Sequence, residues 1–125
     1  NCKQSVLIHN DFVDWNLLTD GNTITGILDL DECAGGAAVC DIASWSGMSS
    51  LERVEEFLKG YFENEKPSKD FDKKLKLISF RWIISNLSLR NSRLEYMPDD
   101  KFLQSLISDG KEQMKFYMNY FNLGE

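Results

Sequence analysis

The fold is decided by residues 6–31, which read VLIHNDFVDWNLLTDGNTITGILDLD. Its apolar residues form three short runs typical of β-strands, at residues 6–8, 17–19 and 23–28. Asp20, Gly21 and Asn22 separate the last two runs, and Gly and Asn tolerate the positive φ that a tight hairpin demands. We therefore predict a β-hairpin whose turn is centred near Gly21.

The predicted hairpin gathers oxygen-bearing side chains. A turn centred on Gly21 places Asn16 opposite Gly26 and brings Asp29 near residue 13, beside the loop that carries Asp11. Carboxylate and amide oxygens are the ligands that Mg²⁺ prefers, and such sites keep room for phosphate oxygens and water. The convergence therefore predicts a site for magnesium and phosphate.

The chain beyond residue 41 has the periodicity of helices. A short helix is expected near residues 41–45. The second helix begins at a capping box opened by Ser49 and ends at Pro67, the third runs from Asp70 to before Pro98, and the fourth takes Asp99 as its N-cap. Residues 34–38, which read AGGAA, are expected to form a flexible loop that lets backbone come close to another part of the chain. The fold class is therefore α+β and helix-dominated, with a small hairpin region bearing the site packed on a helical bundle.

The composition of the chain excludes several classes of protein. The chain has 125 residues, of which 42% are hydrophobic and 27% charged, so it is expected to fold rather than to be disordered. Its net charge of -6 argues against binding nucleic acid. No apolar run is long enough to span a membrane and no signal peptide is visible, so we predict a cytoplasmic protein without a membrane partner. One histidine and three cysteines without CxxC spacing give no zinc-type site, which again points to magnesium.

The order of the polar residues also carries a resemblance. His9-x-Asp11-x-x-x-x-Asn16, a hairpin, Ile27-Leu28-Asp29 and then Asp41-Ile42-Ala43 together resemble the C-terminal lobe of the aminoglycoside phosphotransferase and choline kinase-like small-molecule kinases, relatives of protein kinases. The resemblance covers residues 5–45 closely and the helical remainder only in architecture. Two positions depart from it, because Asn10 stands where many relatives have Gly and Leu30 where many have an aromatic residue.

The resemblance implies a role for each polar residue. Asp11 would be the catalytic base that accepts the substrate hydroxyl proton, and Asn16 and Asp29 would bind Mg²⁺. His9 would brace the loop, and Asp41, at the head of a helix, would hydrogen-bond the backbone of the catalytic loop. Asp31 would lie on the same face as the metal-binding Asp if the strand persisted, and is a candidate for a second metal or for the substrate.

The implied activity is transfer of the γ-phosphoryl group of ATP, or GTP, to a hydroxyl of a small molecule such as an aminoglycoside or another amino or hydroxy metabolite. An acidic chain suits a cationic acceptor. Nothing in the sequence resembles the Gly-rich turn, strand Lys and helix Glu of a nucleotide-binding N-lobe. We therefore expect residues 1–125 to be a single domain, the C-terminal lobe of a longer phosphotransferase that lacks its N-lobe and is inactive alone. Residues 1–32 would hold the catalytic loop and metal-binding hairpin, and residues 41–125 the helical subdomain.

Two other classes of function stay open. A stand-alone lobe could work as a non-catalytic binding module, or the same carboxylates could serve a magnesium-dependent phosphohydrolase that acts on water. Asp14 and Glu32 are expected to be ordinary charged loop residues, and Trp15 a packing anchor.

Overall fold

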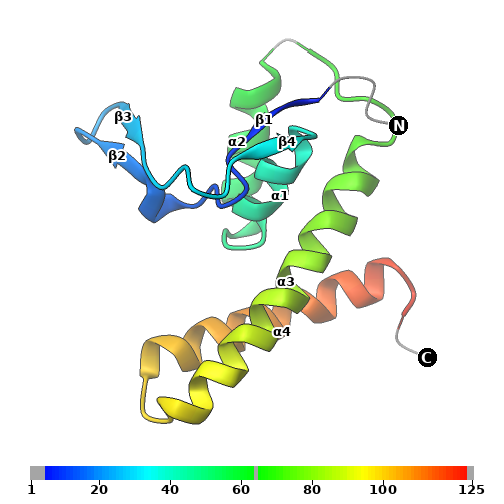
Figure 1. The fold of residues 1–125 in the computed structure, drawn as a ribbon. Coiled ribbons are helices and arrows are strands. Elements are labelled where there is room, and N and C mark those ends of the chain that lie inside the picture. Colours follow the sequence, from blue (N-terminus) through cyan, green and yellow to red (C-terminus); the bar gives the residue numbers. More distant parts are fainter. Residues whose placement is uncertain (1–4, 64, 124–125) are drawn as a thin grey trace. The chain divides into compact units, whose positions relative to one another are not determined.

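A computed structural model describes residues 5–63 and 65–123. The structure is α+β and helix-rich (Figure 1). Its elements in chain order are β1 (Val6–Ile8), the 3₁₀ helix η1 (Asp14–Asn16), β2 (Leu17–Thr19), β3 (Ile24–Ile27), β4 (Ala34–Gly36), α1 (Val39–Ser46), α2 (Leu51–Phe62), α3 (Phe71–Tyr96) and α4 (Lys101–Tyr120). Among the described residues, no helix combines the length and apolarity needed to cross a membrane.

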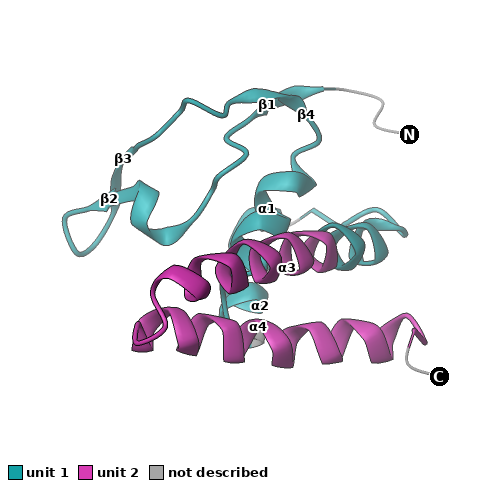
Figure 2. Ribbon diagram, turned by 60° about the horizontal axis from the view of Figure 1, so that its bottom comes forward, with its two compact units in different colours: residues 1–78 teal, residues 79–125 magenta. Residues whose placement is uncertain are grey.

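The chain divides into two compact units, residues 1–78 and residues 79–125 (Figure 2). The division falls inside α3, so that one helix contributes to both units. All residues that the sequence marks as candidates for chemistry lie in the first unit.

The hairpin of β2 and β3 forms as predicted, but its register is different. Gly26 pairs with Leu18 rather than with Asn16, because Thr19 pairs with Ile24 and an irregularity between Leu18 and Thr19 leaves one extra residue on β3. The predicted position of the turn near Gly21 holds, and Gly21 has a φ of 97°.

The hairpin turn is closed by Asp20. Its carboxylate accepts the backbone N–H groups of Thr23 and Asn22 at 2.8 and 2.9 Å. These N–H groups, that of Thr23 first, hold the pKa of the Asp20 carboxyl below its ordinary value. The N–H of Asp20 also donates to the carbonyl of Thr23 at 3.3 Å, so the backbone and the side chain of Asp20 close the turn together.

A second small sheet joins β1 to β4. The segment expected to be a loop, Ala34–Gly36, is instead a strand, antiparallel to Val6–Ile8 with Gly36 paired to Val6. A Cβ atom on Gly36 would lie 2.6 Å from the Cδ1 atom of buried Ile8. The prediction of a loop was therefore wrong. The backbone nevertheless comes close to another part of the chain, as was predicted, and at Gly36 that part is the side chain of Ile8.

Helices α1 and α2 also belong to the first unit. Ile42, Ala43 and Trp45 of α1 are buried. The N-cap of α2 is Ser50, whose side chain accepts the N–H of Arg53 at 3.4 Å, one residue later than the capping box predicted. The helix ends before Pro67 as predicted.

The second unit is a pair of helix segments with its own apolar core. Side chains from one face of α3 and one face of α4 form that core, namely Ile83, Leu87, Leu103, Ile107 and Tyr117. The side chain of Asp100 caps α4 by accepting the N–H of Leu103 at 2.9 Å, one residue after the predicted cap at Asp99. Phe102, in the first turn of α4, is 71% exposed.

Candidate active site

The site begins at His9, which follows β1 and is only 7% exposed. Its ring nitrogen Nε2 lies 2.7 Å from the carbonyl oxygen of Leu28. A carbonyl only accepts, so Nε2 carries the proton, and Nδ1 is left to accept the backbone N–H of Asp11 at 3.3 Å. This tautomer of neutral His9 joins the loop of Asp11 to the strand end at Leu28.

Asp41, in the first turn of α1, holds the same loop by its backbone. One carboxylate oxygen accepts the N–H of His9 and the other that of Asn10, each at 2.8 Å. Asn10 has a left-handed φ of 68°, a conformation that Gly or Asn adopts most readily. The two consecutive N–H groups of His9 and Asn10 both point to this one carboxylate, as the resemblance implies for an Asp at the head of a helix.

Asn16, the last residue of η1, is 6% exposed and turns its amide toward Asp11. Its Nδ2 atom donates to the backbone oxygen of Asp11 at 2.9 Å and to the carboxylate oxygen Oδ2 of Asp11 at 3.0 Å. An amide has two N–H bonds, so both are directed at Asp11. The amide oxygen of Asn16 is the atom that remains to bind a cation.

The position of Asp29 is set by the backbone hydrogen bonds of its neighbour Leu28. The N–H of Leu28 donates to the carbonyl of Asn16 at 2.8 Å, and the carbonyl of Leu28 accepts from His9. Asp29 is the next residue, is exposed, and has a φ of 59°. Its backbone therefore starts beside both ends of the loop, close to Asn16 rather than opposite residue 13.

Asp31 is placed differently from the expectation. The strand ends at Ile27 and the chain turns, with the N–H of Cys33 bonded to the carbonyl of Leu30 at 3.1 Å. The alternation of an extended strand, which would put Asp29 and Asp31 on one face, is thus broken. Asp31 is exposed. Strand geometry therefore does not support its predicted role toward a second metal ion or the substrate.

The donor set of the site suits a hard cation. Asn16 supplies an amide oxygen and Asp29 a carboxylate, and Mg²⁺ takes oxygen ligands of this kind in small number alongside phosphate and water. Over the described ranges, no group of three or more His, Cys, Asp or Glu side chains forms a metal cluster. The candidate pair is of the sparse kind that leaves most coordination positions for phosphate.

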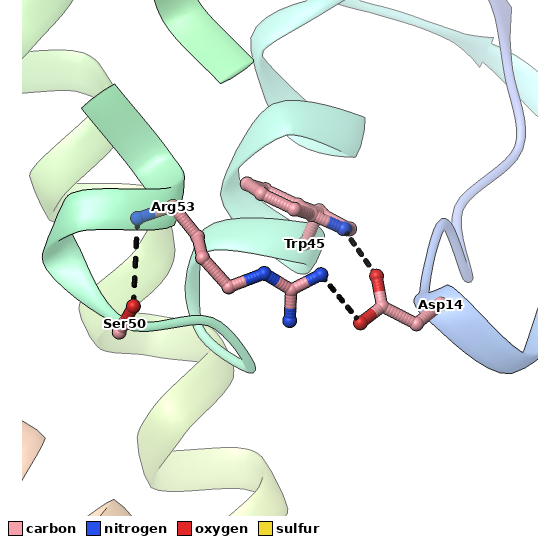
Figure 3. Close-up of polar contacts among 4 residues, drawn as sticks. All are labelled: Asp14, Trp45, Ser50 and Arg53. Atoms are coloured by element: carbon pink, nitrogen blue, oxygen red, sulfur yellow. Dashed lines mark hydrogen bonds and ion pairs between the residues drawn. The ribbon is translucent and has the colours of Figure 1, made fainter. Parts of the chain in front are cut away.

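Asp14 was missed by the sequence analysis. It was expected to be an ordinary charged loop residue, but its carboxylate accepts the indole N–H of Trp45 at 2.8 Å and pairs with Arg53 at 2.9 Å (Figure 3). The two partners lie 31 and 39 residues further along the chain, so no local pattern could have revealed them. Trp15 also differs from its prediction as a packing anchor, because its side chain is 63% exposed. Glu32 is exposed, in keeping with its prediction.

Comparison with known protein families gives one match. A family model described as "Phosphotransferase enzyme family" matches residues 2–73. The match covers more than half of the chain and contains every candidate residue from His9 to Asp41. Neither the search of curated proteins nor that of solved structures found a match.

Proposed function

The chain belongs to the phosphotransferase enzyme family, and from that membership we propose that it carries the catalytic loop of an enzyme that moves the γ-phosphoryl group of ATP, or GTP, to a hydroxyl of a small molecule. The proposed architecture is that of a protein kinase-like C-terminal lobe. An N-lobe of the same natural polypeptide would complete the nucleotide-binding site.

The contact between Asn16 and Asp11 supports this function best. The two bonds from Asn16 hold the backbone oxygen and Oδ2 of Asp11, which orients the carboxylate and leaves Oδ1 to accept the proton of the acceptor hydroxyl. His9 and Asp41 secure the backbone of the same loop. A base held in this way needs no reorientation when the acceptor arrives, and phosphoryl transfer depends largely on such positioning.

Magnesium would be held by the amide oxygen of Asn16 and the carboxylate of Asp29. When bound, the ion neutralises the charge of the phosphates. Asp29 has a left-handed backbone, a conformation that few residues other than Gly, Asn and Asp adopt and that is found often at functional sites. We assign Asp31 a secondary role, toward the substrate or a second ion.

The acceptor is proposed to be cationic, an aminoglycoside or an amino alcohol. The chain carries 20 acidic and 14 basic residues, and an acidic surface concentrates cations near it. This charge is the basis for choosing amino compounds as the first acceptors to be tested.

The test is phosphotransfer by the natural polypeptide with Mg²⁺, ATP and a panel of amino alcohols and aminoglycosides. Asp11→Asn should lower kcat by about 10²–10⁴-fold with little change in nucleotide affinity, since only the proton acceptor is lost. Asp29→Ala should instead abolish Mg²⁺-dependent nucleotide binding. Glu56→Ala, which removes an exposed ion pair with Lys59, is the control and should change neither.

Three results would contradict the proposal. An unchanged kcat in Asp11→Asn would remove the base, and intact Mg²⁺-nucleotide binding in Asp29→Ala would remove the metal ligand. Phosphate released from ATP equally fast without any acceptor would identify a phosphohydrolase. If the natural polypeptide did not bind nucleotide at all, a non-catalytic binding module would replace the enzyme.

A further inference from the structure

The carboxylate of Asp14 joins three elements of the first unit. Asp14 is the first residue of η1, Trp45 belongs to α1 and Arg53 to α2. Its oxygen Oδ1 accepts the indole N–H at 2.8 Å, and Oδ2 accepts from the guanidinium group at 2.9 Å. Figure 3 shows the two side chains reaching the carboxylate from neighbouring helices, with the guanidinium beside the indole.

The indole bond is the stronger of the two anchors. Trp45 is 7% exposed and stacks on Phe57 at a centroid distance of 4.7 Å, so its ring is fixed by packing. A buried indole N–H needs an acceptor, and Asp14 supplies a charged one. Arg53 adds less as an ion pair, because the side chains of Arg53 and Asp14 are 55% and 49% exposed and solvent screens the pair. The guanidinium also lies 5.4 Å from the centre of the Trp45 ring.

The single turn of η1 connects Asp14 to Asn16. The N–H of Asn16 bonds to the carbonyl of Val13 at 3.1 Å, and the N–H of Leu17 bonds to the carbonyl of Asp14. The 3₁₀ turn rises only about 2 Å per residue, so Asp14 and Asn16 move together. Asn16 in turn directs both amide N–H bonds at Asp11.

We propose that Asp14 is a positioning residue, which through η1 holds the amide of Asn16 in the orientation that binds Mg²⁺ and orders Asp11. The inference rests on the proposed function for the meaning of the Mg²⁺ site. The holding of the amide is a property of the protein without metal. Loss of the Asp14 side chain frees η1 from α1 and α2, and the amide of Asn16 loses its fixed orientation. Mg²⁺ affinity falls, and the carboxylate of Asp11 loses the donor that orients it.

The experiment compares three variants of the natural polypeptide. Asp14→Ala removes both anchors, Asp14→Asn keeps an oxygen for the indole N–H of Trp45, and Glu56→Ala removes an exposed ion pair elsewhere on α2. The first readout is hydrogen exchange of the Asn16 side-chain amide, followed by NMR in the metal-free protein. We expect exchange at least about tenfold faster in Asp14→Ala, as local opening becomes easier. Asp14→Asn and Glu56→Ala should stay close to the wild type.

The second readout is the Mg²⁺ concentration for half-maximal phosphotransfer. It should rise by about tenfold in Asp14→Ala, the size of effect expected when a residue supporting a metal ligand is lost, and the KM for the acceptor should not change. Asp14→Asn should restore most of the Mg²⁺ affinity. A general loss of folded protein would instead lower the maximal rate without raising the Mg²⁺ concentration for half-maximal transfer, and Asp14→Asn would not rescue it.

Unchanged exchange of the Asn16 amide in a folded Asp14→Ala protein would overturn the proposal. Should Asp14→Ala fail to fold, Trp45→Phe keeps an aromatic ring against Phe57 and removes the indole N–H together with part of the ring. Faster exchange of the Asn16 amide in that variant, with the backbone amides of α1 exchanging as in the wild type, supports the proposal, and unchanged exchange overturns it. If the wild type transfers no phosphate, the proposed function fails. The metal-free NMR readout then still decides whether Asp14 positions Asn16.

Discussion

At the scale of single residues, the backbone of Asn10 explains a departure from the family pattern. The resemblance implies Gly at this position in many members of the family, and Asn10 has a φ of 68°. Both residue types enter the left-handed region more easily than others, so the identity differs while the conformation is kept. The conformation matters because it sets the direction in which the chain leaves Asn10, whose N–H is held by the carboxylate of Asp41, and leads into Asp11.

This predicts opposite results for two substitutions at Asn10. Asn10→Gly should leave the free energy of unfolding within about 0.5 kcal/mol of the wild type, whereas Asn10→Ala should lower it by about 1 kcal/mol because a Cβ atom is strained at this φ. Urea denaturation followed by tryptophan fluorescence measures both. Asn22→Ala, in an exposed turn without positive φ, is the control. An equal cost of Ala at both positions would show that φ is not the cause.

His9 provides the second prediction at this scale. His9→Ala leaves the carbonyl of Leu28 and the N–H of Asp11 without their partner in a part-buried setting, and should lower the free energy of unfolding by about 2–4 kcal/mol. His9→Gln offers both a donor and an acceptor and should recover part of that loss. The same urea titration distinguishes the variants. If Ala and Gln cost the same, ring packing rather than hydrogen bonding fixes the loop.

At the scale of elements, two helical glycines predict a contrast. A Cβ atom on Gly60 of α2 meets nothing within 4 Å, but one on Gly110 of α4 would lie 2.9 Å from Cδ2 and 3.2 Å from Cγ of Leu87. Ala favours a helix over Gly by about 1 kcal/mol. Gly60→Ala should therefore stabilise the protein by about 0.5–1 kcal/mol, and Gly110→Ala should lose that gain to repacking of Leu87.

Thermal and urea unfolding, monitored by circular dichroism, measure the difference between the two glycine variants. Gly110→Val enlarges the same collision with the buried Leu87 side chain and should be clearly destabilising. Equal stabilisation by Ala at both positions would mean that α3 and α4 separate easily at this point.

The elements also show what local sequence can and cannot predict. The long helices were predictable because apolar residues recur at helical spacing and Pro67 and Pro98 limit them; only the caps moved, to Ser50 and Asp100. Strand β4 was not predictable, since Ala34–Gly36 has no side chains that favour a strand and is extended by pairing with β1.

The same distinction applies to the candidate site. Its core could be read from the sequence because His9, Asp11 and Asn16 lie within one short loop with a recognisable spacing. The support from Asp14 could not, because its partners Trp45 and Arg53 come from helices far along the chain. The hairpin register failed for a similar reason, since one extra residue on β3 leaves no mark in the apolar pattern.

At the scale of the whole molecule, the family match and the compact units have nearly the same boundary. Residues 2–73 match the phosphotransferase family, and the first compact unit is residues 1–78. Every candidate site residue lies within both ranges. The second unit, residues 79–125, has its own core of α3 and α4 side chains outside the matched range. The proposed chemistry therefore belongs to the first unit.

The last prediction concerns the chain of residues 1–125 in isolation. It contains the proposed base and both proposed Mg²⁺ ligands, but nothing in its sequence resembles the Gly-rich turn, strand Lys and helix Glu that hold the phosphates of ATP in such enzymes. Since phosphoryl transfer depends on positioning the nucleotide, the isolated chain should fold and yet show no measurable transfer. The natural polypeptide should be active if it adds an N-lobe with those features.

The measurement is phosphotransfer to a cationic acceptor by both proteins, with the intact mass and N-terminal sequence of the natural polypeptide determined first. Circular dichroism and cooperative unfolding check that the isolated chain is folded, so that inactivity can be assigned to the missing nucleotide contacts. Transfer by the isolated chain at the rate of the natural polypeptide would show that residues 1–125 hold the nucleotide unaided. In that case the proposed division of the ATP site between two lobes would be wrong, although Asp11 and its loop would keep their role.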